Sequence, residues 1–276
     1  MTPTPRETPS SPATRPRNHP LVQSKVPQIT VLFWAVKVLS TGMGETTSDF
    51  LVRLIDPVIA VGLGFIGLVA ALCWQLSRDR YLPWVYWLTV VMVSVFGTMA
   101  ADVLHIVVGI PYAVSTAFFA LALTVVFVLW FRVEKTLSIH SITSRRRELF
   151  YWATVLTTFA LGTAAGDLTA HTLHLGYFAS GALFTVIIAI PAIAFGARKL
   201  NPVLIFWFAY VVTRPLGASF ADWMGVSHAR GGLGWGTGPV SLALGALIAV
   251  LVGVLAFRDR RRPVTLQRPP LASEGY

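Results

Sequence analysis

The sequence predicts an all-α, polytopic membrane protein with about eight transmembrane helices, arranged as four tandem two-helix hairpin repeats. Of the 276 residues, 55% are hydrophobic and only 12% are charged, whereas soluble domains carry about 25% charged residues. The charges gather in the tails and in alternate loops, and one motif recurs at constant spacing. A chain with so few charges cannot cover a surface that faces water, so we expect lipid to be its solvent.

Eight segments are long and apolar enough to cross a bilayer, which takes about 20 predominantly apolar residues. The even-numbered segments carry no charged residue, whereas every odd-numbered segment contains at least one acidic residue. The odd segments are therefore the ones expected to face protein. The predicted spans are 29–52, 57–76, 84–108, 112–131, 149–172, 176–197, 203–224 and 239–257.

The membrane domain, residues 25–257, lies between two polar tails. Residues 1–24 are rich in Pro, Thr, Ser and Arg and lack the apolar core of a signal peptide. Residues 258–276 open with a basic run, and we expect both tails to be disordered. Of the 22 Lys and Arg residues, 18 fall on the side of the N-terminus. The positive-inside rule then predicts a bacterial inner-membrane protein with both termini in the cytoplasm.

A motif of the form [FY]-W-x9-G-x3-[GAS]-D occurs four times without gaps. It divides the membrane domain into repeats at about 25–77, 78–132, 145–197 and 198–257. Each repeat pairs a polar odd helix with an apolar even helix. The motifs start at Phe33-Trp34, Tyr86-Trp87, Tyr151-Trp152 and Phe206-Trp207 and end at Asp49, Asp102, Asp167 and Asp222.

A two-helix repeat returns the chain to its starting side, so all four motif helices must point the same way. This predicts an inner ring of four odd helices sheathed by four even ones, with a looser two-by-two bundle as the alternative. We interpret the aromatic pair as part of the aromatic belt at the membrane interface. The glycine and the small residue four positions later are expected to let helix backbones approach closely.

The motif places one aspartate of each repeat within the membrane. A charged side chain at mid-bilayer costs about 2.5–3.5 kcal/mol, so such groups face protein or water and mark functional sites. The first repeat adds Glu45, and Thr98 and Thr163 hold its position in the next two. These acidic residues outnumber the two cations of the spans, Lys37 and Arg214, which favours cation binding. We expect Arg214 to pair with Glu45.

Histidines follow two of the aspartates. His105 comes three residues after Asp102, and we expect Asp167, His171 and His174 to share one helix face. Carboxylate and imidazole at helical spacing are typical both of divalent-metal sites and of proton relays. With Cys73 as the chain's single cysteine, the ligands suit manganese, iron, cobalt, nickel or zinc rather than Cu(I). The predicted metal-contacting residues are Glu45, Asp49, Asp102, His105, Asp167, His171, His174 and Asp222.

The opening of the first repeat resembles a known family. Its motif reads Lys25-Val26-Pro27, Phe33-Trp34, Lys37, Thr41, Gly44-Glu45 and Asp49. This K-V-P…F-W…K…T-x2-G-E-x3-D pattern is similar to that of bacterial multi-pass proteins described as uncharacterised membrane-anchored proteins. The resemblance covers about residues 25–257 and implies the same repeated membrane architecture, without implying an activity.

Three functions remain open at this point. The first is transport of a small cation, with divalent metals and proton exchange among the candidates, through a carboxylate-lined centre. The second is a membrane redox protein that binds haem between His105 and His171 or His174. The third is a non-catalytic scaffold or sensor whose carboxylates hold the bundle together. No phosphate-binding loop, hydrolase or zincin signature is present, so we expect neither an enzyme nor a nucleic-acid partner.

Overall fold

Each predicted span corresponds to one α-helix in the structure, a computed structural model that describes residues 24–196 and 201–261. The helices are α1 (Val31–Leu54), α2 (Pro57–Leu76), α3 (Pro83–Asp102), α4 (Tyr112–Glu134), α5 (Arg145–Asp167), α6 (Gly176–Gly196), α7 (Pro202–Gly225) and α8 (Thr237–Arg260). Two π-helical turns, η1 (Val103–Val107) and η3 (Leu168–Thr172), directly follow α3 and α5. Two short 3-10 turns, η2 (Ile139–Ser141) and η4 (His228–Arg230), lie in connecting loops.

The predicted tails fall almost wholly outside the described residues. At the C-terminal side, helix α8 continues three residues past the predicted boundary at 257, through Arg258 and Asp259 to Arg260.

Helix starts follow local sequence signals. Pro57, Pro83 and Pro202 each stand at the beginning of a helix, where a missing N–H leaves no hydrogen bond unmade. Asp56 caps α2 by accepting from the Val58 N–H at 2.9 Å, and Asn201 caps α7 by accepting from the Val203 N–H at 2.8 Å. These helix starts are therefore determined by local sequence rather than by tertiary contacts.

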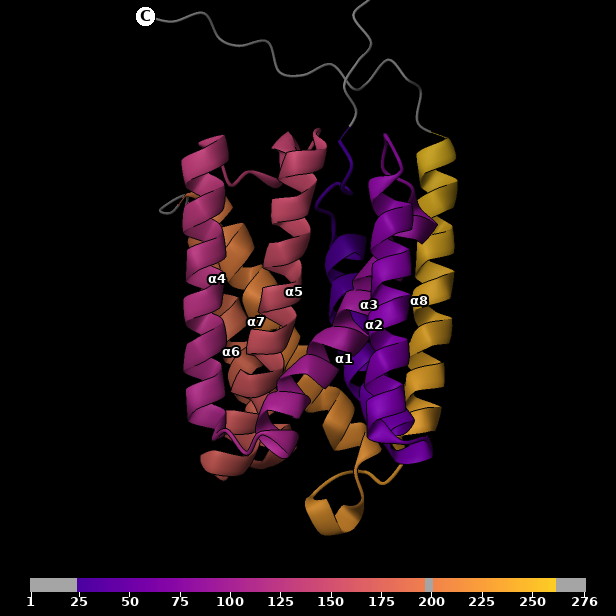
Figure 1. The fold of residues 1–276 in the computed structure, drawn as a ribbon, viewed down its shortest axis with the longest axis vertical. Coiled ribbons are helices and arrows are strands. Elements are labelled where there is room, and N and C mark those ends of the chain that lie inside the picture. The colour runs from indigo at the N-terminus through magenta and orange to yellow at the C-terminus, as the bar shows by residue number, and fades with distance from the viewer. Residues whose placement is uncertain (1–23, 197–200, 262–276) are drawn as a thin grey trace, which may run out of the picture. The chain divides into compact units, whose positions relative to one another are not determined.

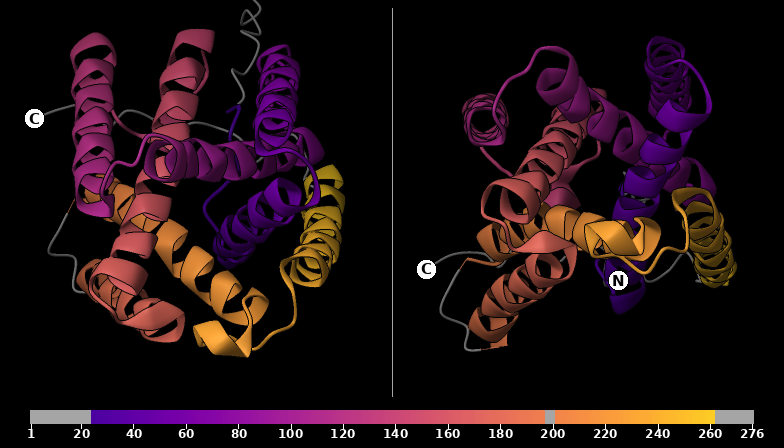
Figure 2. Two further views of the ribbon diagram at one scale, coloured as in Figure 1. Left: turned by 60° about the horizontal axis from the view of Figure 1, so that its bottom comes forward. Right: turned by 90° about the horizontal axis from the view of Figure 1, so that it is seen from below.

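The four odd helices form a closed ring. Helix α1 packs against α3, α3 against α5, α5 against α7, and α7 returns to α1. Seen from below, these helices are strongly tilted and lie around the centre of the bundle like the four sides of a frame (Figure 2). The structure confirms the predicted inner ring and excludes the looser two-by-two bundle.

The even helices sheath this ring in a shifted order. Helix α2 packs mainly against α3, α4 against α5, α6 against α7, and α8 against α1. Each outer helix thus covers the inner helix of the next repeat, and α8 closes the cycle on the first repeat (Figure 1). The repeats are therefore interlocked, and none of them forms a compact unit alone.

Close backbone contact explains the motif glycines. A Cβ added to Gly97 would lie 2.8 Å from the Cβ of Phe159 on the next inner helix. The same contact recurs around the ring, always between a motif glycine and the residue seven positions after the motif tryptophan of the following repeat. The glycines and their partners are Gly44 with Ser94, Gly97 with Phe159, Gly162 with Arg214, and Gly217 with Thr41. The packing role predicted for these glycines is confirmed.

The exposed surface of the outer helices is apolar. In the described part of the chain, six helices (α2, α3, α4, α5, α7 and α8) are long and apolar enough to cross a membrane. The most apolar stretches of α3, α5 and α7 are 56–61% buried, whereas those of α2, α4 and α8 are only 22% buried. Helix α1 has the required length but carries Lys37, Glu45, Asp49 and Arg53. A bundle with charges inside and apolar side chains outside is a multi-pass membrane protein.

The aromatic pairs do not form an interfacial belt, and this prediction is wrong. Phe33, Tyr86 and Tyr151 are at most 1% exposed. Their rings and those of the neighbouring tryptophans pack together in the main hydrophobic core. The physical reason is the sheath: outer helices cover the inner ring at this level, so its aromatic side chains meet each other instead of lipid headgroups.

Candidate functional site

The inner helices present every fourth residue to the ring axis. An α-helix has 3.6 residues per turn, so residues four apart lie on nearly one face and about 6 Å apart in height. Counted from the motif tryptophan, these positions are −1, +3, +7, +11 and +15. At the first four positions, no side chain in any repeat is more than 6% exposed. The axis is therefore a stack of side-chain layers, each with one residue from every repeat.

The +15 layer consists of the four motif aspartates. The side chains of Asp49 and Asp167 are 23% and 16% exposed, and Asp222 is 7% exposed as a whole residue. Asp49, Asp102, Asp167 and Asp222 all interact electrostatically with Glu45. The fold thus gathers carboxylates from all four repeats at one end of the ring.

Glu45 and Arg214 form a buried ion pair in the +11 layer. The Nη2 of Arg214 donates to Oε2 of Glu45 at 2.6 Å, and the side chains are 6% and 0% exposed. The same nitrogen contacts the hydroxyl of Thr163 at 2.6 Å and that of Thr98. Thr98 also donates to Oε2 of Glu45 at 3.4 Å. The predicted Glu45–Arg214 pair is confirmed, and it joins all four inner helices.

The departure of the fourth repeat from the pattern makes this arrangement possible. Three repeats place Glu45, Thr98 and Thr163 at +11, and the fourth has Ala218 there. Arg214, one helical turn below Ala218, extends its guanidinium into the space at the centre of the layer. Its Nε and Nη1 atoms have no hydrogen-bond partner among the described residues.

Lys37 lies one layer further from the aspartates, at +3. It is 1% exposed, and its Nζ has no hydrogen-bond partner in the described structure. The Nζ instead lies 4.1 Å from the ring centre of Phe159 and 4.3 Å from that of Tyr210. Phe159 is shared with Arg214, whose guanidinium carbon lies 5.5 Å from the same ring. Both interior cations therefore contact aromatic faces.

Hydroxyl groups continue the axis below Lys37. At −1 the Tyr86 and Tyr151 hydroxyls are hydrogen-bonded to each other, and both residues are fully buried.

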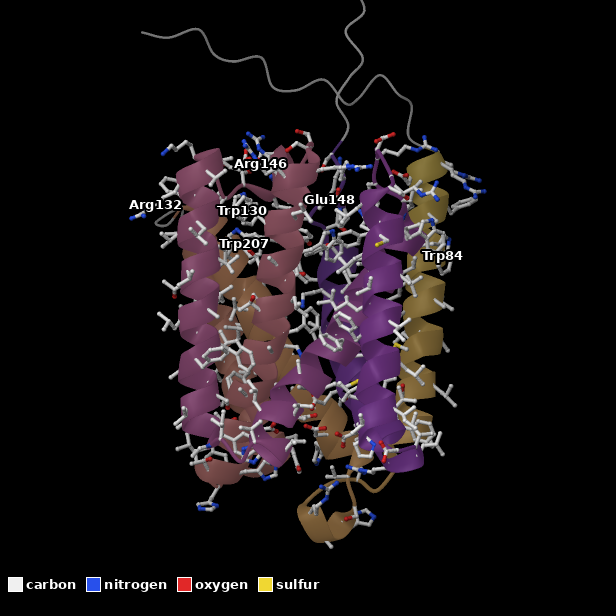
Figure 3. The ribbon with its side chains drawn as sticks, viewed as in Figure 1. Trp84, Trp130, Arg132, Arg146, Glu148 and Trp207 are labelled. Carbon is white, nitrogen blue, oxygen red and sulfur yellow. The ribbon has the colours of Figure 1, made fainter. Side chains whose placement is uncertain are left out.

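The end of the bundle where the described chain begins is sealed by a second buried network. Lys25 donates to Glu148 at 2.9 Å, and Gln75 of α2 donates to the other carboxylate oxygen at 2.8 Å. Figure 3 shows Glu148 near this end, beside the exposed Arg146. The N-terminal segment, Ser24–Thr30, is also held by the N–H of Lys25, which donates to the Ile142 carbonyl at 3.0 Å.

Tyr81, in the loop before α3, borders the same segment. Its backbone N–H donates to the Ser24 carbonyl at 3.2 Å. Burial raises the pKa of the Tyr81 hydroxyl above its ordinary value. The hydroxyl therefore stays neutral beside the buried Lys25–Glu148 ion pair.

The histidines lie at the edge of the aspartate layer. The ring of His105 stacks on Tyr112 at 3.4 Å between centres, and its Nδ1 contacts the Ile110 carbonyl at 2.8 Å. His171 lies 4.0 Å from Asp167 and 3.3 Å from the Tyr177 hydroxyl.

The prediction that Asp167, His171 and His174 share one helix face is wrong for His174. Helix α5 ends in the π-helical turn η3 at Thr172, so His174 lies beyond the helix, exposed and with a positive φ of 54°. The matching turn η1 follows Asp102 in the second repeat. Such π-turns change the register of a helix, which spacing counted at 3.6 residues per turn cannot anticipate.

The geometry does not assemble a closed metal site. Among residues 24–196 and 201–261, no three His, Cys, Asp or Glu side chains are grouped so that they could hold a metal ion. The role of the eight residues predicted to contact a metal remains a prediction. The ring of Tyr112 is stacked on both His105 and His171, at 3.4 and 5.8 Å. These imidazoles therefore do not face each other across free space, which disfavours haem ligation.

An open pocket of about 600 Å³ lies at the aspartate end, between the ends of α1 and α7 and the start of α8. Arg53 and Arg230 line it, and Arg53 also pairs with Asp49 at 2.6 Å. The carboxylate layer is thus next to a water-accessible surface.

Two parts of this site were not predicted from the sequence. Glu148 accepts from both Gln75 and Lys25, although Lys25 looks like an ordinary topology-determining charge in the sequence. The available signal was Gln75, the one amide in the otherwise apolar second span. The tyrosine pair was also missed, because its place in the motif favours an interfacial role.

Taken together, fold and site define a multi-pass membrane protein in which four copies of a two-helix repeat surround a polar axis. The sequence model of a family described as "Repeat of Unknown Function (DUF347)" matches the chain four times, at residues 32–81, 85–136, 150–199 and 205–261, and the chain belongs to this family. The match bears out the predicted four-repeat architecture, whereas the resemblance to membrane-anchored proteins stays a prediction. No curated protein and no solved structure matches the chain.

Proposed function

We propose that this protein transports a small cation across the bacterial inner membrane along the axis of its inner ring. The observation that carries the proposal is the convergence of five carboxylates, one aspartate from each repeat and Glu45, at one end of that axis. Carboxylates at membrane depth are costly unless they serve an ion or proton pathway.

The charge balance of the axis supports a cationic substrate. Glu45 and the four aspartates are opposed by Arg214 and Lys37, so the interior is negative when all of these groups are ionised. Arg214 compensates Glu45 directly, which leaves the aspartates to attract cations from the adjoining water. Oxygen ligands suit hard cations, including protons, Mg²⁺ and Mn²⁺.

The orientation in this proposal follows from the basic loops. The end with Lys25 and Arg146 faces the cytoplasm, and the aspartate end faces outward. From the outside, a cation would reach the aspartates first and then Glu45. Beyond Glu45, buried layers and the Lys25–Glu148 network close the path. A site accessible from one side and closed on the other is what alternating access requires.

The proposal is tested with purified protein in liposomes. Na⁺, K⁺, Mg²⁺, Mn²⁺, Fe²⁺, Co²⁺, Ni²⁺ and Zn²⁺ are offered singly, luminal metal is measured by mass spectrometry, and luminal pH by a trapped dye. We expect at least one cation to be taken up by the wild type, and Glu45→Gln or Asp102→Asn to reduce uptake to that of protein-free liposomes. Asp79→Asn, a change of an exposed loop carboxylate, is the matched control and should transport normally. Uptake of no cation by the folded wild type would exclude the proposal.

A structural role for the carboxylates is the second candidate, and the four-helix network around Arg214 favours it. In a scaffold or sensor, Glu45→Gln would lower the stability of the bundle and no variant would have a transport phenotype. Asp102→Asn separates the two functions, because Asp102 lies outside the Glu45–Arg214 hydrogen bonds. A transporter loses uptake in this variant at unchanged stability.

A further inference from the structure

Lys37 is a buried axial cation without a hydrogen bond or ion pair among the described residues. Its Nζ has neither a hydrogen bond nor an ion pair, although the side chain is 1% exposed. Arg214, by contrast, is bonded to Glu45, Thr98 and Thr163. Of the two buried cations on the axis, Arg214 is therefore paired with a carboxylate, whereas Lys37 is not.

An ammonium group carries three donors and strong hydration, and an isolated buried charge is heavily disfavoured. The rings of Phe159 and Tyr210, at 4.1 and 4.3 Å, offer only partial compensation. The enclosure of Lys37 therefore favours the neutral amine. A side chain that must lose its proton when enclosed, and can regain it in contact with water, is suited to carry a proton.

The charged groups around Lys37 come from a small set of helices. Helix α1 packs against α2, α3, α7 and α8. Helix α2 has no charged residue, α3 contributes only Asp102, and α8 has charges only in its last turn, at the end of the bundle where α1 begins. Helix α7 contributes Tyr210, Arg214 and Asp222, and α5, across the axis, presents the uncharged Phe159 to Lys37. The charge that acts most directly on Lys37 is that of Arg214.

This arrangement links Lys37 to the cation site through Arg214. While Glu45 pairs with Arg214, the carboxylate offsets part of the positive charge near Lys37. A cation that takes the place of Arg214 on Glu45 leaves the guanidinium uncompensated, and its repulsion then opposes a proton on Lys37. Binding free energies coupled in this way act reciprocally, so a proton on Lys37 also weakens cation binding.

We propose that Lys37 is the proton-binding site of a cation–proton exchanger, in which a proton on its Nζ and a cation at Glu45 exclude each other. The inference rests on the proposed transport function. The exchange is a movement of ions only: Nζ takes up a proton from water reached on one side and releases it to water on the other.

The test compares wild-type protein, Lys37→Met and Lys37→Arg in liposomes, with the cation that the wild type takes up. Lys37→Met should lose cation accumulation driven by a pH gradient, and the linked luminal pH change, by at least about tenfold. It should keep cation-for-cation counterflow without a gradient. Lys37→Arg, with a permanent charge, should impair both. Lys135→Met, on an exposed loop lysine, should behave as the wild type.

Proton-coupled transport by Lys37→Met at the wild-type level would overturn the inference and leave cation transport intact. Absence of transport by the wild type would instead exclude the proposed function.

Protein stability provides a measurement that needs no substrate. If the enclosed Lys37 is neutral, the unfolded chain binds one more proton, so the stability of the wild type relative to Lys37→Met should rise with pH from mildly acidic to mildly alkaline buffer. A pH-independent difference would overturn the inference as well.

Discussion

Arg214 of α7 donates to Glu45 of α1 at 2.6 Å, across 169 residues of chain. The contact joins the last repeat to the first at the point where the ring closes. Glu45 is also the carboxylate that interacts electrostatically with all four motif aspartates. One ion pair thus connects the closure of the fold with the acidic end of its axis.

Removal of one partner of this pair should be strongly destabilising. Arg214→Met leaves the Glu45 carboxylate buried without its cation, which typically costs about 3–5 kcal/mol. The double variant Glu45→Gln/Arg214→Met should recover part of that loss. Unfolding in a denaturant series in detergent measures both. Arg53→Met is the control, because the Arg53–Asp49 pair has the same 2.6 Å length but side chains 52% and 23% exposed. Arg53→Met should change stability by about 1 kcal/mol or less. Equal losses of stability in Arg53→Met and Arg214→Met would contradict the burial assigned to the Glu45–Arg214 pair.

The motif glycines should not tolerate even one methyl group. Gly97→Ala would place a Cβ 2.8 Å from the Cβ of Phe159, and such overpacking costs about 1–3 kcal/mol. Gly62 of α2 is a matched helical glycine with no atom within 4 Å of an added Cβ. Gly62→Ala should stabilise the protein by up to about 1 kcal/mol, through helix propensity alone. Thermal unfolding monitored by helical circular dichroism distinguishes these opposite signs.

Glu148 should hold the N-terminal segment in the bundle. Val26 in that segment is 5% exposed, so Val26→Cys, made in a Cys73→Ala background, should react slowly with maleimide. Adding Glu148→Gln removes the ion pair with Lys25, and labelling should become fast. Glu134→Gln, which breaks a pair with Arg146 and Arg147 at the same end, should leave labelling slow. Slow labelling in all variants would mean that other contacts hold the segment.

The orientation can be checked by labelling whole cells with a membrane-impermeant maleimide. Ser227→Cys, at the aspartate end, should react in intact cells, because the positive-inside rule places that end outside. Asp79→Cys, in an exposed loop near the N-terminal segment, should react only after permeabilisation. The opposite pattern would reverse the proposed direction of access to the carboxylates.

Much of the site was predictable because its residues recur at fixed spacing. Four aspartates at one motif position imply one shared level around an axis. The pairing of Glu45 with Arg214 could be predicted from their similar depth in the membrane, because their positions in the repeat differ by only one helical turn. His174 was misplaced because a π-turn ends α5 at Thr172, and no hydropathy pattern signals such a turn. The aromatic pairs were misinterpreted because burial by a neighbouring repeat is not visible in one span.

The sequence by itself determined the helices, the common direction of the four motif helices and the level of each charge, because hydropathy, helix caps and repeat spacing act over a few turns of one segment. Only the tertiary structure decided which outer helix covers which inner one, and which charges meet. Among the described residues, Arg214 has three hydrogen-bond partners, whereas Lys37 contacts only aromatic rings, because ring closure brings the four inner helices together around both. Those contacts join residues far apart in the chain, so their energies depend on the closed ring and not on local sequence.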